Sequence, residues 1–172
     1  DYRSSRGLGD VYKRQGAKVN EIVGGKYDHT GESIVYGDTD SVYFSAHKTL
    51  AKEIESGKIP WTKESVIGLY DKIADEVNTT FSGYMHKAFH CPTTRGSVIK
   101  AGRELVASKG LFITKKRYAV LYYDKEGERT DHAGKPGKMK AMGLDLKRSD
   151  TPVFVQDFLS EILMMVLQGK DE

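Results

Sequence analysis

The sequence predicts an α+β protein built on an antiparallel sheet, with an acidic β-hairpin and a long packed helix. Two short β-rich runs, residues 33–36 and 41–44, enclose the turn-forming sequence Gly-Asp-Thr-Asp, which predicts a hairpin. Over residues 64–90, apolar side chains recur at steps of three and four, as on one face of an amphipathic helix. Two further β-rich runs, 97–107 and 111–124, predict the remaining strands of the sheet.

The N-terminal segment differs from the rest of the chain. Residues 1–15 show no hydrophobic periodicity, and we expect them to be disordered or not native to the protein. Residues 17–23 fit the last turns of a helix, and the two glycines at 24–25 are a typical helix end. Further along, residues 124–127 predict a turn after the last of the expected strands.

The C-terminal part begins with a basic, Gly- and Pro-rich connector at residues 134–140. A helix is then expected from Val153 to about Gln168, with Asp150 or Thr151 as its N-cap and Pro152 in its first turn. This helix is apolar on most sides, so we expect it to need packing partners on more than one face.

Length and composition are those of one globular domain. The chain has 172 residues, of which 38% are hydrophobic and 30% are charged. No run approaches the roughly 20 apolar residues of a membrane span, and no signal peptide is recognised, so we expect no membrane partner. The single cysteine, Cys91, excludes an internal disulfide and a zinc site made of several cysteines, and it fits a reducing compartment.

Positive charge is concentrated in one region. Residues 109–148 contain eleven Lys and Arg against five Asp and Glu, whereas the net charge of the whole chain is +3. A basic region of this kind is compatible with a polyanionic partner and equally with a solvated surface.

The expected hairpin carries two carboxylates, Asp38 and Asp40, at its tip. Like charges this close repel by about 1 kcal/mol or more, and a divalent cation would remove that cost. Carboxylate oxygens suit Mg²⁺ or Mn²⁺. A calcium loop is excluded, because no Glu closes a twelve-residue ligand loop. The two aspartates alone also fit ordinary turn residues or a metal-dependent glycosyltransferase.

Two longer motifs narrow these alternatives. The sequence Tyr-Gly-Asp-Thr-Asp-Ser at residues 36–41 matches the third polymerase motif of family B DNA polymerases, and Lys-Lys-Arg-Tyr at residues 115–118 resembles the KKRY element of the same family. The tract from Met142 to Pro152 resembles the palm-to-thumb junction of replicative polymerases of tailed bacteriophages. The resemblance covers roughly residues 19–170.

The resemblance implies a fold and a catalytic site. Residues 16–148 would be the C-terminal part of a polymerase palm, and residues 149–172 the start of a helical thumb. Asp40 would bind both catalytic Mg²⁺ ions (Mn²⁺ is possible), and Asp38 would support the site. Glu104 would act near the metals through water, although Gly102 stands where some phage relatives carry a second acid.

The resemblance also implies a DNA-binding surface. Lys116 and Tyr118 would contact the primer terminus, with Lys115 and Arg117 on the opposite side of an alternating strand. Contacts of lysine with phosphate or with the minor groove tolerate any base sequence, as a polymerase requires. Three lysines at the thumb base would face the duplex backbone: Lys135, Lys138 and Lys140.

The expected function is therefore that of a fragment of a DNA-directed DNA polymerase. The parent would add deoxynucleotides to a primer 3′ end by two-metal-ion nucleotidyl transfer, in the cytoplasm of a phage-infected bacterial host. Its partners would be primer–template DNA, deoxynucleoside triphosphates and a sliding clamp. We expect the fragment alone to be inactive, because the upstream palm aspartate, the fingers helix and the exonuclease are absent.

Two other functions stay open. A non-catalytic DNA-binding module from an inactivated polymerase relative would not need the paired acids Asp38 and Asp40, and the upstream reading frame would distinguish it. A glycosyltransferase would have no role for the KKRY element.

Overall fold

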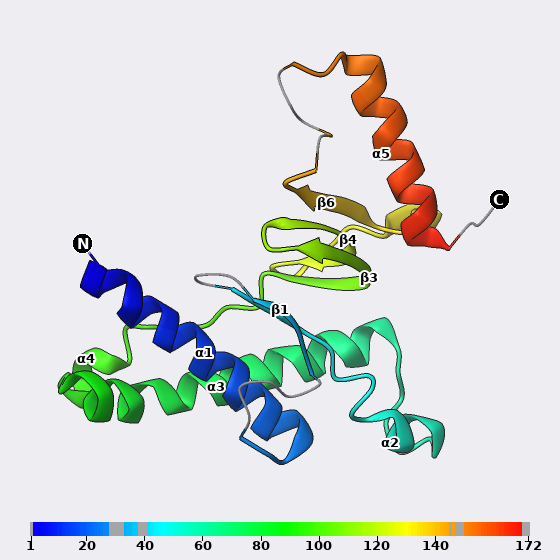
Figure 1. Ribbon diagram of the computed structural model, residues 1–172. Coiled ribbons are helices and arrows are strands. Elements are labelled where there is room, and N and C mark those ends of the chain that lie inside the picture. Colours follow the sequence, from blue (N-terminus) through cyan, green and yellow to red (C-terminus); the bar gives the residue numbers. More distant parts are fainter. Residues whose placement is uncertain (1, 28–32, 38–40, 145, 147–149, 170–172) are drawn as a thin grey trace. The chain divides into compact units, whose positions relative to one another are not determined.

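The structure is a computed structural model that describes residues 2–27, 33–37, 41–144, 146 and 150–169. The chain forms two compact units, Asp1–Gly102 and Arg103–Glu172, each described by itself (Figure 1). Helices and antiparallel strand pairs are both present, so the predicted α+β class is confirmed. The expected division into palm and thumb at residue 149 is not tested by these units and stays a prediction.

The first unit holds the predicted hairpin and most of the helices. Its elements are α1 (Tyr2–Gly24), β1 (Ile34–Gly37), β2 (Val42–Phe44), α2 (Ala51–Glu55), α3 (Lys63–Phe89) and α4 (Thr93–Gly96). Strands β1 and β2 pair antiparallel, with Ile34 opposite Phe44 and Gly37 opposite Val42. The predicted hairpin is therefore confirmed in its two strands.

The long helix α3 agrees with the predicted range. A capping box starts it: the Thr62 hydroxyl accepts the backbone N–H of Ser65 at 3.2 Å, and the Ser65 side chain accepts the N–H of Thr62 at 3.0 Å. It ends at His90, whose backbone is left-handed, and Pro92 follows closely. The buried face contains four of the predicted apolar positions, Val66, Ile73, Val77 and Phe81.

The hairpin is mounted on the core of the first unit. Buried side chains of α1 and α3 form this core, and Ile34 of β1 and Phe44 of β2 pack against it. The rings of Phe44 and Tyr70 meet edge to face at 5.1 Å between centroids. The Tyr70 hydroxyl accepts the Ala46 N–H at 3.4 Å, and burial raises the pKa of this phenol. Both strands are thus fixed at the end opposite the tip.

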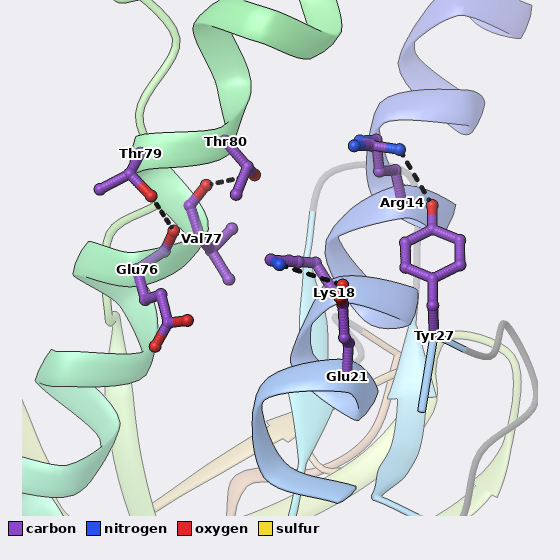
Figure 2. Close-up of polar contacts among 8 residues, drawn as sticks. All are labelled: Arg14, Lys18, Glu21, Tyr27, Glu76, Val77, Thr79 and Thr80. Atoms are coloured by element: carbon purple, nitrogen blue, oxygen red, sulfur yellow. Dashed lines mark hydrogen bonds and ion pairs between the residues drawn. The ribbon is translucent and has the colours of Figure 1, made fainter. Parts of the chain in front are cut away.

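Helix α1 corrects one expectation. It runs back to Tyr2, so the expectation that residues 1–15 lack regular structure is wrong, whereas the expectation that they are not native stays untested. The Arg14 guanidinium donates to the Tyr27 hydroxyl at 3.1 Å (Figure 2). The central carbon of the same guanidinium lies 4.5 Å from the centre of the Tyr84 ring. These contacts tie α1 to α3. The helix ends at Gly24, as predicted.

The first of the two later strands is placed differently from the prediction. Residues 97–104 belong to no strand: residues 97–98 form a turn after α4, and β3 begins only at Leu105. The Ala101 N–H donates to Asn78 Oδ1 at 2.6 Å, and Asn78 Nδ2 donates to the Ala101 carbonyl at 3.0 Å. A side chain of α3 therefore satisfies this backbone in place of a neighbouring strand.

The second unit is a four-stranded antiparallel sheet with one helix. Strand β4 pairs with β3, β5 and β6, all antiparallel. The elements are β3 (Leu105–Thr114), β4 (Arg117–Lys125), β5 (Glu128–Arg129), a 3₁₀ helix (His132–Gly134), β6 (Lys138–Met142) and α5 (Val153–Gln168). The predicted single strand over 111–124 is wrong, because a turn at residues 115–116 divides it. The predicted connector also stops earlier, since its last residues, 138–140, begin β6.

Helix α5 has the predicted bounds but a different start. Pro152 occupies the N-cap position, with no side-chain cap, so the expected capping by Asp150 or Thr151 is wrong. Instead, Gln156 Nε2 donates to the Thr151 carbonyl at 2.8 Å. The helix meets the sheet near its C-terminal end (Figure 1). The side chains involved are Leu163, Met164 and Leu167 of α5 with Ala119, Leu121, Met139 and Ala141 of the sheet. Another face stays exposed: Phe154, Phe158, Ile162, Met165 and Val166.

Candidate functional site

The acidic tip falls at a gap in the described residues. Asp38 and Asp40 lie outside the described residues, and β1 and β2 flank them on either side. Within the residues that the structure does describe, no cluster of three or more His, Cys, Asp and Glu side chains could hold a metal ion. A metal assignment to Asp38 and Asp40 therefore rests on the sequence motif and on the rigid strands that carry it.

The basic element 115–118 is the end of a hairpin. Strand β3 ends at Thr114, β4 begins opposite it at Arg117, and Lys115 and Lys116 form the turn between them. Lys116 is in the left-handed region, with φ 63°. Both lysines are exposed. The expected alternation of these residues along one strand is therefore wrong, and the turn presents both ammonium groups to solvent.

A glycine supports this turn from the far side of β4. Arg117 Nε donates to the Gly143 carbonyl at 3.2 Å. Gly143 has φ +65°, and a Cβ there would overlap the Lys116 carbonyl oxygen. Only glycine allows the backbone after β6 to approach the turn this closely.

Tyr118 has a different environment from the lysines before it. It is 4% exposed, and its ring stacks on that of Phe112, with centroids 5.7 Å apart. Phe112 is its cross-strand neighbour in β3. The ring therefore stiffens the hairpin, and a contact of Tyr118 with the primer stays a prediction.

The lysines expected at the thumb base divide into two groups. Lys138 and Lys140 lie two residues apart on β6, so their side chains leave the same face of the sheet. Lys135 precedes the strand and is exposed. Lys140 Nζ lies 2.6 Å from Glu104 Oε1. The structure therefore pairs two residues to which the sequence assigned separate roles.

Glu104 directly precedes β3, and both its backbone and its side chain are held by hydrogen bonds. Its carbonyl accepts the Glu126 N–H at 2.8 Å, which ties it to the turn between β4 and β5. Its side chain is half-exposed, at 49%. The carboxylate is thus accessible to solvent, and one ammonium group already matches its charge.

A buried ion pair beside Glu104 was not predicted from the sequence. The Arg103 guanidinium pairs with the Asp124 carboxylate, and the side chains are 11% and 3% exposed. Asp124 Oδ1 also accepts the Gly127 N–H at 3.2 Å. The sequence placed Asp124 in a turn, where an exposed carboxylate is the ordinary expectation. The signal that could have revealed it is its position directly after the apolar run of β4.

Comparison with known proteins identifies the family. Residues 9–172 match the family described as DNA polymerase family B. The chain is 36% identical over 161 residues to the DNA-directed DNA polymerase of Escherichia phage RB69, a match that covers 88% of this chain and 17% of that protein. It is 27% identical over 170 residues to the DNA-directed DNA polymerase of Enterobacteria phage T4, covering 90% of this chain and 18% of that protein.

A eukaryotic relative gives the same result. The DNA polymerase delta catalytic subunit of Oryza sativa subsp. japonica is 29% identical over 147 residues, covering 86% of this chain and 10% of that subunit. The chain spans less than a fifth of the length of each of these relatives. The family match covers nearly the whole chain and includes both the YGDTDS and KKRY sequences, so the chain belongs to DNA polymerase family B, as its motifs predicted.

Proposed function

We propose that this chain is the C-terminal part of the catalytic palm (residues 16–148) and the start of the thumb (residues 149–172) of a DNA-directed DNA polymerase. The polymerase adds deoxynucleotides to the 3′ end of a primer during DNA replication. The observation that carries the proposal is the family match over residues 9–172, which contains the acidic hairpin and the basic turn in one chain.

Three carboxylates serve nucleotidyl transfer in this proposal. Asp40 is the main metal ligand, Asp38 supports it, and Glu104 acts nearby through water. Bound Mg²⁺, or Mn²⁺ in its place, supplies positive charge that stabilises the attacking 3′ oxygen and the leaving pyrophosphate. The chain contributes the two strands that flank these aspartates in sequence, and both strands pack on the core made by α1 and α3.

The basic turn binds the primer strand in this proposal. Lys115 and Lys116 are exposed at the end of the β3–β4 hairpin, and Arg117 begins the next strand. Ammonium groups at such a tip reach a phosphate or a minor-groove acceptor whatever the base sequence. Lys135 and Lys138 extend the positive charge toward the duplex backbone. Tyr118 keeps the hairpin rigid by stacking on Phe112, and its contact with the primer terminus is part of the proposal.

Further partners belong to the whole polymerase. Primer–template DNA and deoxynucleoside triphosphates are its substrates, and a sliding clamp is its expected partner for processive synthesis. Its location is then the cytoplasm of a phage-infected bacterial cell. In the described part of the chain, no helix is both long enough and apolar enough to cross a membrane.

The test uses the full reading frame that contains this chain. The purified product should extend a primed template in the presence of Mg²⁺ and all four deoxynucleoside triphosphates. Binding of primer–template DNA without any extension would support the alternative, a non-catalytic DNA-binding module. Absence of both binding and extension would overturn the proposal.

A further inference from the structure

Glu104 is restrained at three points by residues of the second unit. The Arg103–Asp124 ion pair fixes the preceding residue, the Glu126 N–H binds the Glu104 carbonyl, and Lys140 Nζ lies 2.6 Å from its carboxylate. The Lys140 backbone is fixed in turn, because it pairs with Val120 in the centre of the sheet. Lys140 lies within β6, and Glu104 directly precedes β3 and is held by its backbone, so little further ordering is needed to form the pair.

Lys138 provides a contrast on the same strand. It is exposed, it leaves the same face of β6 as Lys140, and its ammonium group has no ion-pair partner among the described residues. Lys140 is more buried, with its side chain 30% exposed, and its short contact with Glu104 is a charge-assisted hydrogen bond. The two lysines therefore differ in surroundings although they share chemistry and strand.

We propose that Lys140 is a positioning residue that holds the Glu104 carboxylate, and that it does not contact the DNA backbone. This assignment rests on the proposed function only for the role of Glu104 in nucleotidyl transfer. The Glu104 carboxylate already neutralises the Lys140 ammonium, so a phosphate bound there would lie beside a second negative charge. Lys138 has no ion-pair partner in the described part of the chain, so its charge is available to a phosphate. Of the two lysines on β6, Lys138 is then the one that binds DNA.

The first test measures the ion pair itself in the 172-residue chain. Nitrogen-15 NMR spectra of the lysine ammonium groups report which of them exchange slowly with water because they donate to a carboxylate. The Lys140 signal should be retained in the wild type and lost in Glu104→Gln, whereas the Lys138 signal should be the same in both. An unchanged Lys140 signal in Glu104→Gln would overturn the proposal.

The second test asks whether DNA binds the Lys140 ammonium group. Binding of a primer–template duplex is measured by fluorescence anisotropy over a salt series for the wild type, Lys140→Met and Lys138→Met. Each substitution removes one positive charge from the same face of β6. Lys138→Met should lower the slope of log affinity against log salt by about one unit, and Lys140→Met should leave it unchanged. A reduced slope for Lys140→Met would show a phosphate contact and overturn the assignment.

A third measurement separates positioning from general structure in the full-length polymerase. Lys140→Met should lower kcat about tenfold with the primer–template Kd unchanged. Lys140→Arg should restore most of the rate, and Lys140→Met should have no further effect in a Glu104→Gln background. If the duplex binds none of these proteins, the proposed DNA-binding surface fails, and the assignment of Lys140 is still decided by the NMR comparison.

Discussion

Lys116 has a left-handed backbone conformation, with φ 63°, which residues other than glycine usually avoid. Such a residue costs about 1–2 kcal/mol, so the conformation persists only where the neighbouring structure imposes it. Here the paired strands on both sides impose it, since Thr114 stands directly opposite Arg117. The strained residue is also an exposed lysine at the end of a hairpin, which is consistent with a position selected for binding.

The first prediction concerns the charge of Lys116. In the full-length polymerase, Lys116→Ala should weaken primer–template binding to a similar degree for every DNA sequence. If the contact is to a phosphate, the slope of log affinity against log salt should fall by about one unit. Lys125→Ala is the control, because Lys125 is an exposed lysine at the other end of β4. Equal small effects of both substitutions would make Lys116 an ordinary surface lysine.

The second prediction separates the two aspartates of the hairpin tip. Asp40→Ala in the full-length polymerase should abolish nucleotide addition and leave DNA binding intact, because a metal ligand acts mainly in the transition state. Asp38→Ala should cost less of the rate. Single-turnover primer extension, together with DNA-binding measurements, checks both. The opposite order of severity would assign the primary ligand to Asp38.

At the scale of elements, an ion pair joins the end of β4 to the segment that precedes β3, in addition to the pairing of the two strands. Asp124 is 2% exposed and accepts both the Arg103 guanidinium and the Gly127 N–H. A buried carboxylate is tolerated only when its hydrogen-bonding capacity is met, and this one is met from two segments. The ion pair therefore holds in place the segment that carries Glu104.

The third prediction tests this tie. Asp124→Asn keeps an oxygen for the Gly127 N–H but removes the negative charge that pairs with the nearly buried Arg103 guanidinium. It should lower the free energy of unfolding by about 3 kcal/mol, measured by urea denaturation of the 172-residue chain. Glu21→Gln, which breaks the more exposed Lys18–Glu21 pair in α1 (Figure 2), should cost less than about 0.5 kcal/mol. Similar losses in both variants would show that the buried pair is no stronger than a surface pair.

The fourth prediction concerns the attachment of α1. Arg14 lies in the segment expected to be disordered or not native, yet its guanidinium contacts Tyr27 and Tyr84. Arg14→Met should lower Tm by about 2–4 °C, the loss expected for roughly 1 kcal/mol in a chain of this size. Lys72→Met, at an exposed position of α3, should leave Tm unchanged. An unchanged Tm for Arg14→Met would show that these contacts do not stabilise the fold.

Elements with a strong period were predicted well, whereas their joints were not. The long helix α3 and the helix α5 agree with their apolar patterns. Exposed and partly buried residues alternate over most of residues 97–104, and Ile99 and Ala101 pack on the core of the first unit. However, the Asn78 side chain forms the hydrogen bonds of the Ala101 backbone that a neighbouring strand was expected to form. The turn at Lys115 and Lys116 was missed because it contains no Gly, Pro, Asn or Asp.

At the scale of the whole molecule, the chain has two compact units, and each carries one of the two motifs. The acidic hairpin belongs to the first unit, and the KKRY turn belongs to the second. The sequence predicted both motifs but not the pairs around Glu104, because contacts between residues 36 positions apart, such as Glu104 and Lys140, leave no local pattern. Such partners follow from the sheet register, which the sequence did not predict.

The fifth prediction concerns the chain as a catalyst. The match covers 17% of the RB69 polymerase, and we expect the upstream palm aspartate and the fingers helix elsewhere in the parent. The pure 172-residue chain should therefore give no primer extension with Mg²⁺ and all four deoxynucleoside triphosphates. A gel assay on a primed template checks this, with the full-length polymerase as the positive control. Extension by the chain alone would contradict the proposed domain boundaries.

Gly143 has a consequence for how this part of the polymerase can be exchanged between relatives. Its missing side chain leaves room for the Lys116 carbonyl, and its own carbonyl binds Arg117. The conformation of the KKRY turn therefore depends on the tract after β6, although 26 residues separate Arg117 from Gly143. A chimaera that receives the hairpin from another polymerase must receive a glycine at this position as well, or its turn will be displaced. In recombination and in protein engineering, the hairpin and the Gly143 segment must therefore be exchanged as one unit.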